Sequence, residues 1–191
     1  MYDMSDVPGV LQGMLLVAKP GLVDPNFSRS VVLLLAHSDE GALGLVLNRP
    51  TASPVATALP DWAELATPPA TVFVGGPVVE GTICLARLKS EVAVPASGYL
   101  TLQGALGTVD LDADPSFVAP WIDCLRIFAG YAGWGAGQLE DEIAQDAWWV
   151  LPPADGDVFA AEPEALWKAV LRRQGGRLAV VSALPVDPSL N

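Results

Sequence analysis

The sequence predicts a mixed α+β protein, and three observations lead to this prediction. Short apolar runs recur along the chain between glycine, proline, asparagine and aspartate residues, which is typical of strands. Two segments with helical periodicity, 138–147 and 163–174, lie late in the sequence. Because the expected strands outnumber the helices and do not alternate with them regularly, a doubly wound parallel sheet is not expected.

The first half of the chain predicts mainly strands. They are expected at 14–18, 31–36, 43–47, 72–74 and 82–88. Because these runs are continuously apolar rather than alternating, we expect both of their faces to be covered. Ser53 followed by Pro54 predicts the N-cap and first residue of a short helix that ends near Leu59. A proline-containing connection over 61–69 follows, with another helical turn as an alternative.

The second half predicts further strands and the two longer helices. Strands are expected at 98–102, 108–111, 124–129, 148–151 and 178–182, with a turn or short helix at 115–121. Leu139, Ile143 and Ala147 share one face of the helix expected at 138–147. The helix at 163–174 has an apolar side as well, and the glycine pair that follows is expected to end it.

The composition is that of a protein with a large core and few charges. The chain has 191 residues, of which 51% are hydrophobic, so we expect one domain covering residues 1–191. Charged residues make up 17% of the chain, compared with about 25% in typical soluble proteins. Much of the surface must therefore be small or apolar, and a homo-oligomer would be one way to cover it.

The net charge argues against nucleic acid as a direct partner. Twenty-two acidic and ten basic residues give a net charge of −12, which repels phosphate backbones and anionic lipids. The densest basic group, at 172–177, lies at the expected end of a helix, where cations complement the helix dipole. No helix-turn-helix is evident. We therefore expect an unidentified protein as the partner.

Cysteine use and hydropathy predict a cytoplasmic location. Cys84 and Cys124 each lie in an apolar run, which is typical of core thiols in a reducing compartment. The apolar stretch at 13–18 is preceded by Asp3 and Asp6 instead of basic residues, which argues against a secretory signal. The apolar runs are much shorter than the roughly 20 residues of a membrane helix, so we expect no membrane association.

Three segments combine glycine with aromatic or arginine residues. They are DPNFSRSVVLLLAHSDEGALGLVLNRP at 24–50, VFVGGPV at 72–78 and RIFAGYAGWGAGQLEDE at 126–142. The four glycines of the last segment predict a tightly turned loop between a strand and an acidic helix start. Together the segments resemble the YqgE/AlgH family of bacterial proteins. The resemblance implies a bent, mixed sheet that closes into a pseudo-barrel with helices packed outside, in a family usually described as transcriptional regulators.

Familiar catalytic signatures are missing from the sequence. It contains no phosphate-binding loop, dinucleotide fingerprint, serine-hydrolase elbow, zinc-protease motif or paired cysteines. With one histidine, a multi-histidine metal site is excluded, and we expect no metal, no cofactor and no enzymatic activity. His37 is the candidate general base, with Ser30, Cys84 or Cys124 as its nucleophile. The alternative, which we favour, is a strand-end histidine that bonds a loop carbonyl.

The candidate ligand or partner surface combines residues of all three segments. They are Arg29, Asn48, Arg49, Gly75, Gly76, Tyr131, Trp134 and Gln138. The arginines could bind an anion, but pairing with Asp24, Glu140 or Glu142 is the favoured alternative in so acidic a chain. The glycine pair could hold an anion and the rings could contact a partner, but we favour the alternatives, in which the glycine pair only reverses the chain and the rings pack in the core. A nucleotide is not expected, because the acidic first turn at 140–142 would repel a phosphate.

The sequence therefore predicts a non-catalytic binding or regulatory protein that acts through protein contacts. The first alternative is a small-ligand-binding protein or enzyme whose cleft is formed by the three segments. The second is a structural subunit of an oligomer. If the regulatory description of the family applies, we expect regulation to be indirect, because direct DNA binding would have to overcome the net charge.

Overall fold

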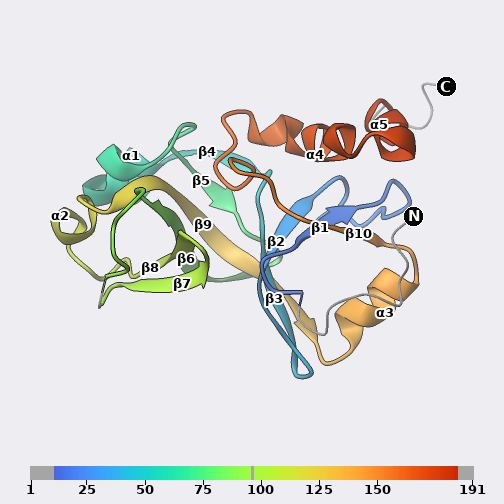
Figure 1. Ribbon diagram of the computed structural model, residues 1–191, viewed down its shortest axis with the longest axis horizontal. Coiled ribbons are helices and arrows are strands. Elements are labelled where there is room, and N and C mark those ends of the chain that lie inside the picture. The colour runs from blue at the N-terminus through green and yellow to red at the C-terminus, as the bar shows by residue number, and fades with distance from the viewer. Residues whose placement is uncertain (1–10, 96, 185–191) are drawn as a thin grey trace.

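The computed structural model describes residues 11–95 and 97–184, which form a curled, mainly antiparallel sheet with helices packed around it (Figure 1). Ten strands form this sheet in the order β10-β1-β2-β3-β9-β6-β8-β7, with β5 beside β9 and β4 beside β5. The β5–β9 pair is parallel and the other pairs are antiparallel. The expected bent, mixed sheet is confirmed in the form of a half-barrel.

Most of the expected strands are present, several with different ends. The strands are β1 (Leu15–Ala18), β2 (Val31–Ser38), β3 (Gly41–Val46), β4 (Pro50–Pro54), β5 (Thr71–Val74), β6 (Val78–Leu88), β7 (Tyr99–Gln103), β8 (Leu106–Val109), β9 (Ile122–Gly135) and β10 (Trp148–Leu151). The helices are α1 (Val55–Ala58), α2 (Pro115–Val118), α3 (Gln138–Ala144), α4 (Leu166–Gln174) and α5 (Gly176–Ser182), with 3₁₀ turns η2 (Pro60–Leu65) and η3 (Pro163–Ala165).

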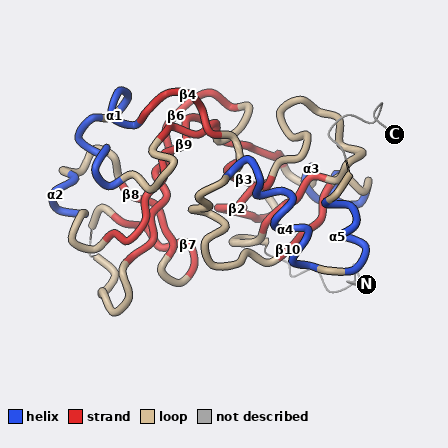
Figure 2. Tube along the Cα trace, turned by 90° about the horizontal axis from the view of Figure 1, so that it is seen from above, coloured by secondary structure: helices blue, strands red, loops and turns tan. Residues whose placement is uncertain are grey.

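Strand β9 joins the two halves of the sheet. Its residues 122–131 pair with β6, whereas residues 132–135 pair with β3. In Figure 1, β9 crosses from the half that contains β6, β7 and β8 to the half that contains β1, β2, β3 and β10. Seen from above in Figure 2, α1 and α2 again lie at one end of the molecule and α3, α4 and α5 at the other. The single long strand therefore positions both halves.

Strand β2 is covered on both faces, as its continuous apolar run predicts. Val31 and Leu33 pack in the cluster that includes Val170 of α4. Val32 and Leu34, which point the opposite way, pack in the cluster on the side of α3. Helices on both faces thus remove the apolar first half of the strand, residues 31–34, from water.

The glycine-rich segment after Phe128 is a strand and not the expected loop. Gly130 has a φ of 70°, a conformation that favours glycine, and it interrupts the regular pairing with β6. A Cβ atom on Gly130 would overlap the carbonyl oxygen of Val78, and one on Gly75 would overlap the carbonyl oxygen of Gly130. The glycines therefore allow backbones to approach closely where β9 crosses between halves, and the loop prediction is wrong.

Two other predictions at element ends are also wrong. Residues 178–182 belong to helix α5, because Leu178 and Val181 lie three positions apart and pack on the core while Val180 is 70% exposed. Pro54, and not Ser53, is the N-cap of α1, without a side-chain hydrogen bond. Ser53 belongs to β4, which pairs with β5.

We predict that Gly75→Ala destabilises the fold by about 2 kcal/mol or more, a cost typical of overpacking against atoms that cannot move. The new Cβ would overlap backbone atoms of Gly130 and press on Leu45. Chemical unfolding of the purified variant measures the change. Gly21→Ala is the matched control, because no atom lies within 4 Å of a Cβ at that position. Equal stability of the two variants would contradict the prediction.

Candidate functional site

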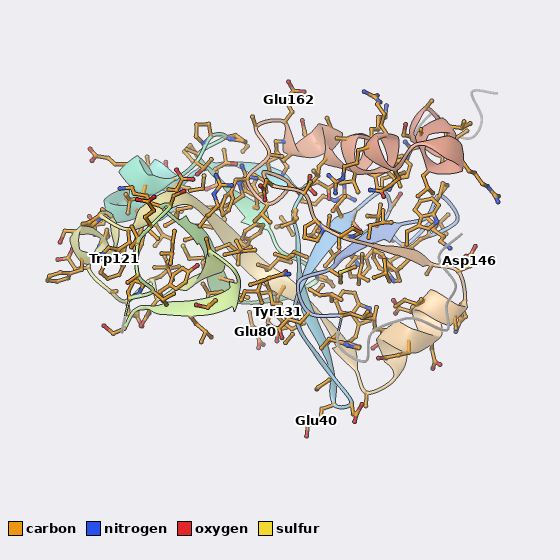
Figure 3. The ribbon with its side chains drawn as sticks, viewed as in Figure 1. Glu40, Glu80, Trp121, Tyr131, Asp146 and Glu162 are labelled. Carbon is orange, nitrogen blue, oxygen red and sulfur yellow. The ribbon has the colours of Figure 1, made fainter. Side chains whose placement is uncertain are left out.

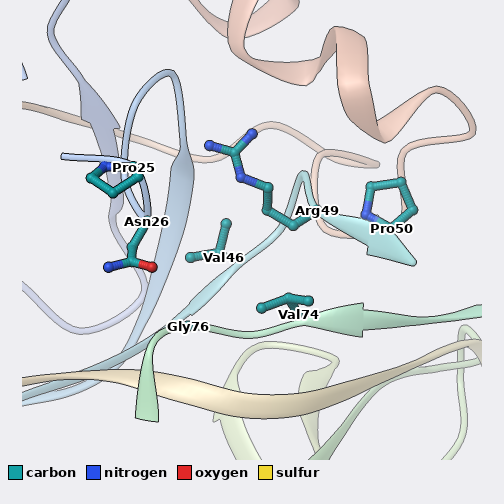
Figure 4. Close-up of a pocket in the computed structure, with 7 residues that line it drawn as sticks. All are labelled: Pro25, Asn26, Val46, Arg49, Pro50, Val74 and Gly76. Atoms are coloured by element: carbon teal, nitrogen blue, oxygen red, sulfur yellow. The ribbon is translucent and has the colours of Figure 1, made fainter. Parts of the chain in front are cut away.

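A shallow pocket of about 250 Å³ opens where β3 and β5 meet the turn at 25–26 (Figure 4). Its lining residues are Pro25, Asn26, Val46, Arg49, Pro50, Val74 and Gly76. They come from two of the three glycine-containing segments, 24–50 and 72–78. Figure 4 shows Val46, Val74 and Gly76 between the turn on one side and Arg49 with Pro50 on the other.

Asn48 fixes the backbone next to this pocket. Its side chain is 4% exposed, and its Oδ1 accepts a hydrogen bond from the Val31 amide at 2.9 Å. Its Nδ2 donates to the carbonyl of Arg29, also at 2.9 Å. The two bonds tie the end of β3 to the chain that enters β2. Asn48 therefore holds this backbone in place, and it thereby fixes the position of the next residue, Arg49.

The two candidate arginines point to different places. Arg49 is half-buried and lines the pocket, where its Nη2 donates to the carbonyl of Ser28 at 2.5 Å. Arg29 instead lies over the ring of Trp167, 4.8 Å from its centroid, and donates from both terminal nitrogens to the carbonyl of Leu184. Arg49 is thus the one of the two that faces the pocket.

The carboxylates expected to pair with these arginines bind other groups. Asp24 accepts from the backbone amide of Asn26 at 2.8 Å. Glu140 pairs with His37, and Glu142 accepts from tryptophan side chains. The expected pairing of the arginines with these three acids is therefore wrong. Each of these acids instead accepts hydrogen bonds from a backbone amide, a histidine or tryptophan side chains.

Trp134 and Gln138 belong to an aromatic cluster beside α3. The Trp134 ring is 6% exposed, stacks on Phe27 at 5.9 Å between centroids, and meets Trp148 edge-on at 6.2 Å. Glu142 Oε2 accepts from the indole Nε1 of both tryptophans at 2.9 Å, and its Oε1 accepts from Gln138 at 3.0 Å. One carboxylate therefore holds the cluster together.

The structure does not bring the predicted surface residues into one cleft. Of that set, Arg49 and Gly76 line the pocket. Gly75 is buried at the joint between the halves, where its amide donates to the carbonyl of Ala129 and its carbonyl accepts from Val46, both at 2.8 Å. Tyr131 is partly buried on β9, and Figure 3 shows it where the halves meet. A binding role for these residues stays a prediction.

His37 has both ring nitrogens in hydrogen bonds. Nδ1 accepts from the backbone amide of Leu11 at 3.1 Å, so this nitrogen carries no proton. Nε2 lies 2.7 Å from Glu140 Oε1 and is therefore the donor in that pair. The side chain is 7% exposed. This imidazole joins the β2–β3 hairpin to the first turn of α3, in keeping with a structural role, although its partner is a carboxylate and not a loop carbonyl.

The nucleophiles that the sequence allowed lie far from His37. Ser30 precedes β2 and His37 is near its end, seven residues away, which is about 23 Å along a strand. Cys84 pairs with Ile127 of β9, seven residues from the β9 position beside the β2–β3 hairpin. Burial also raises the pKa of the Cys84 thiol to about 12, so its nucleophilic thiolate is disfavoured at neutral pH.

No group of three or more metal-binding side chains occurs within 11–95 and 97–184. Of the helices in these ranges, none is long and apolar enough to cross a membrane. Both cysteines are free thiols.

Sequence reasoning missed three residues that matter here. Asn26 and Val74 line the pocket, but neither carries a signal of its own in the sequence. Arg126 is 2% exposed within β9 and donates to the carbonyls of Pro68, Val158 and Ala160. A lone arginine inside the run WIDCLRIFAG was the available signal, because a buried charge requires partners.

The fold and its pocket define an α+β protein with a curled sheet and an arginine-lined surface pocket at the junction of the two halves. A family described as AlgH-like matches residues 15–179 of the chain. The chain belongs to this family. It is 52% identical to a UPF0301 protein of Streptomyces coelicolor over the whole of both chains, and 45% identical to one of Mycobacteroides abscessus over 94% of this chain and 87% of that one.

Solved structures show the same fold. The crystal structure of protein DIP2367 from Corynebacterium diphtheriae superposes with a TM-score of 0.87 at 31% identity, covering 94% of each chain. The solution structure of the AlgH protein from Pseudomonas aeruginosa gives a TM-score of 0.68 at 31% identity, covering 97% of this chain and 98% of the other.

We predict that Glu142→Ala lowers the free energy of unfolding by about 2 kcal/mol or more, because two buried indole N–H groups lose their acceptor. Chemical unfolding followed by tryptophan fluorescence measures the loss. Glu142→Gln should lose less, since its amide oxygen can still accept a hydrogen bond. Asp141→Ala, one residue earlier and exposed, is the control. A loss no larger than that of the control would refute the role of Glu142.

We predict that the contribution of Glu140 to stability depends on pH. The backbone amide at the start of α3 and the hydrogen bond from His37 hold the pKa of this carboxyl below its usual range. Its stabilisation is therefore present above the ordinary pKa of about 4.3 and is lost as pH falls through the lower folded value. The free energies of unfolding of wild type and Glu140→Gln should differ at pH 7, and the difference should shrink as pH falls below about 4.3. A difference that persists at acid pH would contradict this.

Proposed function

We propose that this AlgH-family protein is a non-catalytic regulator that acts in the cytoplasm by contact with another protein. One observation carries the proposal. At the junction of the two halves, the described residues that line the pocket offer apolar surface and an arginine, and they include no histidine, cysteine or carboxylate that could transfer a proton. Val74 is 44% exposed and lines the pocket with Arg49, and Val79, three residues after Gly76 along the chain and just beyond the 72–78 segment, is 87% exposed. We call Asn26, Arg49, Val74 and Val79 the joint surface.

The chemistry of the joint surface suits a protein partner. An exposed valine, Val74, beside a half-buried arginine combines apolar area with a directional donor, a combination common in protein interfaces. The net charge of −12 disfavours nucleic acid as the direct partner, so the regulation we propose is indirect. The two free cysteines support the proposed reducing compartment.

A second candidate function, binding of a small ligand, is favoured by the pocket itself. At about 250 Å³, however, it is smaller than the roughly 300–1,000 Å³ typical of sites that enclose a whole small molecule. The pocket fits one group of a larger partner better than an entire metabolite. Self-association is the competing occupant of the joint surface, and sizing of the purified protein distinguishes it from a heterologous partner.

We predict that a photo-crosslinking amino acid at position 79 captures a discrete partner in cells, whereas the same residue at position 94 does not. Val94 is a matched control, because it is also an exposed valine, at 55%, and lies outside the joint surface. Mass spectrometry of the crosslinked band identifies the partner. The proposal would fail if neither position gave a band above background or if both gave the same bands.

A further inference from the structure

We propose that the pocket of the joint surface binds a single carboxylate of a partner polypeptide, with the Arg49 guanidinium as the main ligand. This inference rests on the proposed function and adds to it the chemical group that is recognised. It is carried by the donors of the pocket, by its charge and by its size.

The donors of the pocket are largely unused. Ser28 takes one hydrogen bond from Arg49, and most of the five guanidinium N–H groups have no acceptor among the described residues. The side-chain amide of Asn26 is exposed, and the described part of the chain offers it no hydrogen-bond partner. A guanidinium edge and a neighbouring amide can together satisfy both oxygens of a carboxylate.

The pocket also contrasts in charge with the rest of the protein. The chain carries a net charge of −12, yet the described residues that line this pocket include no aspartate or glutamate. Asp24, the nearest acid along the chain, is turned to the amide of Asn26. Arg49 is therefore a local cation that a partner's acid can reach without meeting a carboxylate on the pocket wall.

One cation favours a carboxylate over a phosphate. A phosphate group carries about −1.5 to −2 charges at neutral pH, which a single guanidinium does not balance in so acidic a protein. The remaining lining is apolar, from Val46, Val74 and two prolines, and it can contact the methylene groups that carry the acid. The small volume admits one side chain, so the expected ligand is an aspartate or glutamate flanked by apolar residues.

The test is a titration of the ¹⁵N-labelled full chain with the blocked peptide acetyl-Val-Glu-Val-amide. The Gly76 backbone amide and the Asn26 side-chain amide should shift in a saturable way. The glutamine peptide acetyl-Val-Gln-Val-amide should bind at least about tenfold more weakly, because a charge-assisted hydrogen bond is replaced by a neutral one. Equal binding of the two peptides would overturn the proposal, as would shifts confined to other residues.

Two variants test the pocket directly. Arg49→Gln removes the cation and Asn26→Asp places an acid in the pocket. Each variant should therefore bind the glutamate peptide at least about tenfold more weakly than wild type does. Asn26 is exposed, so its variant is expected to fold even if the loss of Arg49 disturbs the turn. Arg172→Gln, which removes an exposed arginine of α4, is the control and should leave binding unchanged.

Two further ligands distinguish the sources of the anion. Free 3-methylbutanoate should bind more weakly than the glutamate peptide, and tighter binding of this free acid would overturn the assignment to a partner polypeptide. Inorganic phosphate should bind more weakly as well, and tighter binding would overturn the carboxylate. If Arg49→Gln keeps the crosslink at position 79 and no peptide binds, this inference fails while the proposed function stands. Absence of the crosslink at position 79 with Arg49 in place, together with no peptide binding, would refute both.

Discussion

The fold depends on the close contact between Gly75 and strand β9. The amide of Gly75 donates to Ala129 of β9 and its carbonyl accepts from Val46 beside it, so this residue bonds both halves of the sheet. A side chain at Gly75 would overlap the backbone of Gly130. Glycine is therefore required at position 75, because the two backbones lie too close together to leave room for a side chain. Gly76, the next residue, lines the pocket, so the same contact also fixes the position of the candidate site.

Buried polar side chains then fix the segments that surround this joint. Asn48 bonds two backbone groups of the chain that enters β2. Arg126 lies 4.4 Å from the ring centroid of Phe73 and binds three carbonyls of the chain segments outside the sheet. Its burial without a carboxylate partner lowers the pKa of the guanidinium to about 10, which still leaves it charged at neutral pH. These side chains supply hydrogen bonds to backbone groups that lie mostly in irregular segments, where strand pairing does not supply a partner.

Much of what looks like functional chemistry in the sequence serves packing. Glu142 satisfies two indole groups, and His37 connects a hairpin to α3 through Glu140. In a protein with few charges, such polar residues are needed to satisfy donors at the edges of the core. The proposed binding site is limited to the pocket, where Arg49 supplies the positive charge. This division explains why the candidate pocket contains only part of the surface predicted from the sequence.

The sequence by itself determined the α+β class, most strand positions and the helices at 138–144 and 166–174, because apolar runs and helical periodicity are local properties of the chain. It also identified Arg49 and Gly76 as candidates. Only the tertiary structure decided that the segment after Gly130 is a strand, that 178–182 is helical and that Asn26 and Val74 join Arg49 in one pocket. Backbone approach and contacts between distant segments determine these features, and neither can be read from the order of residues along the chain.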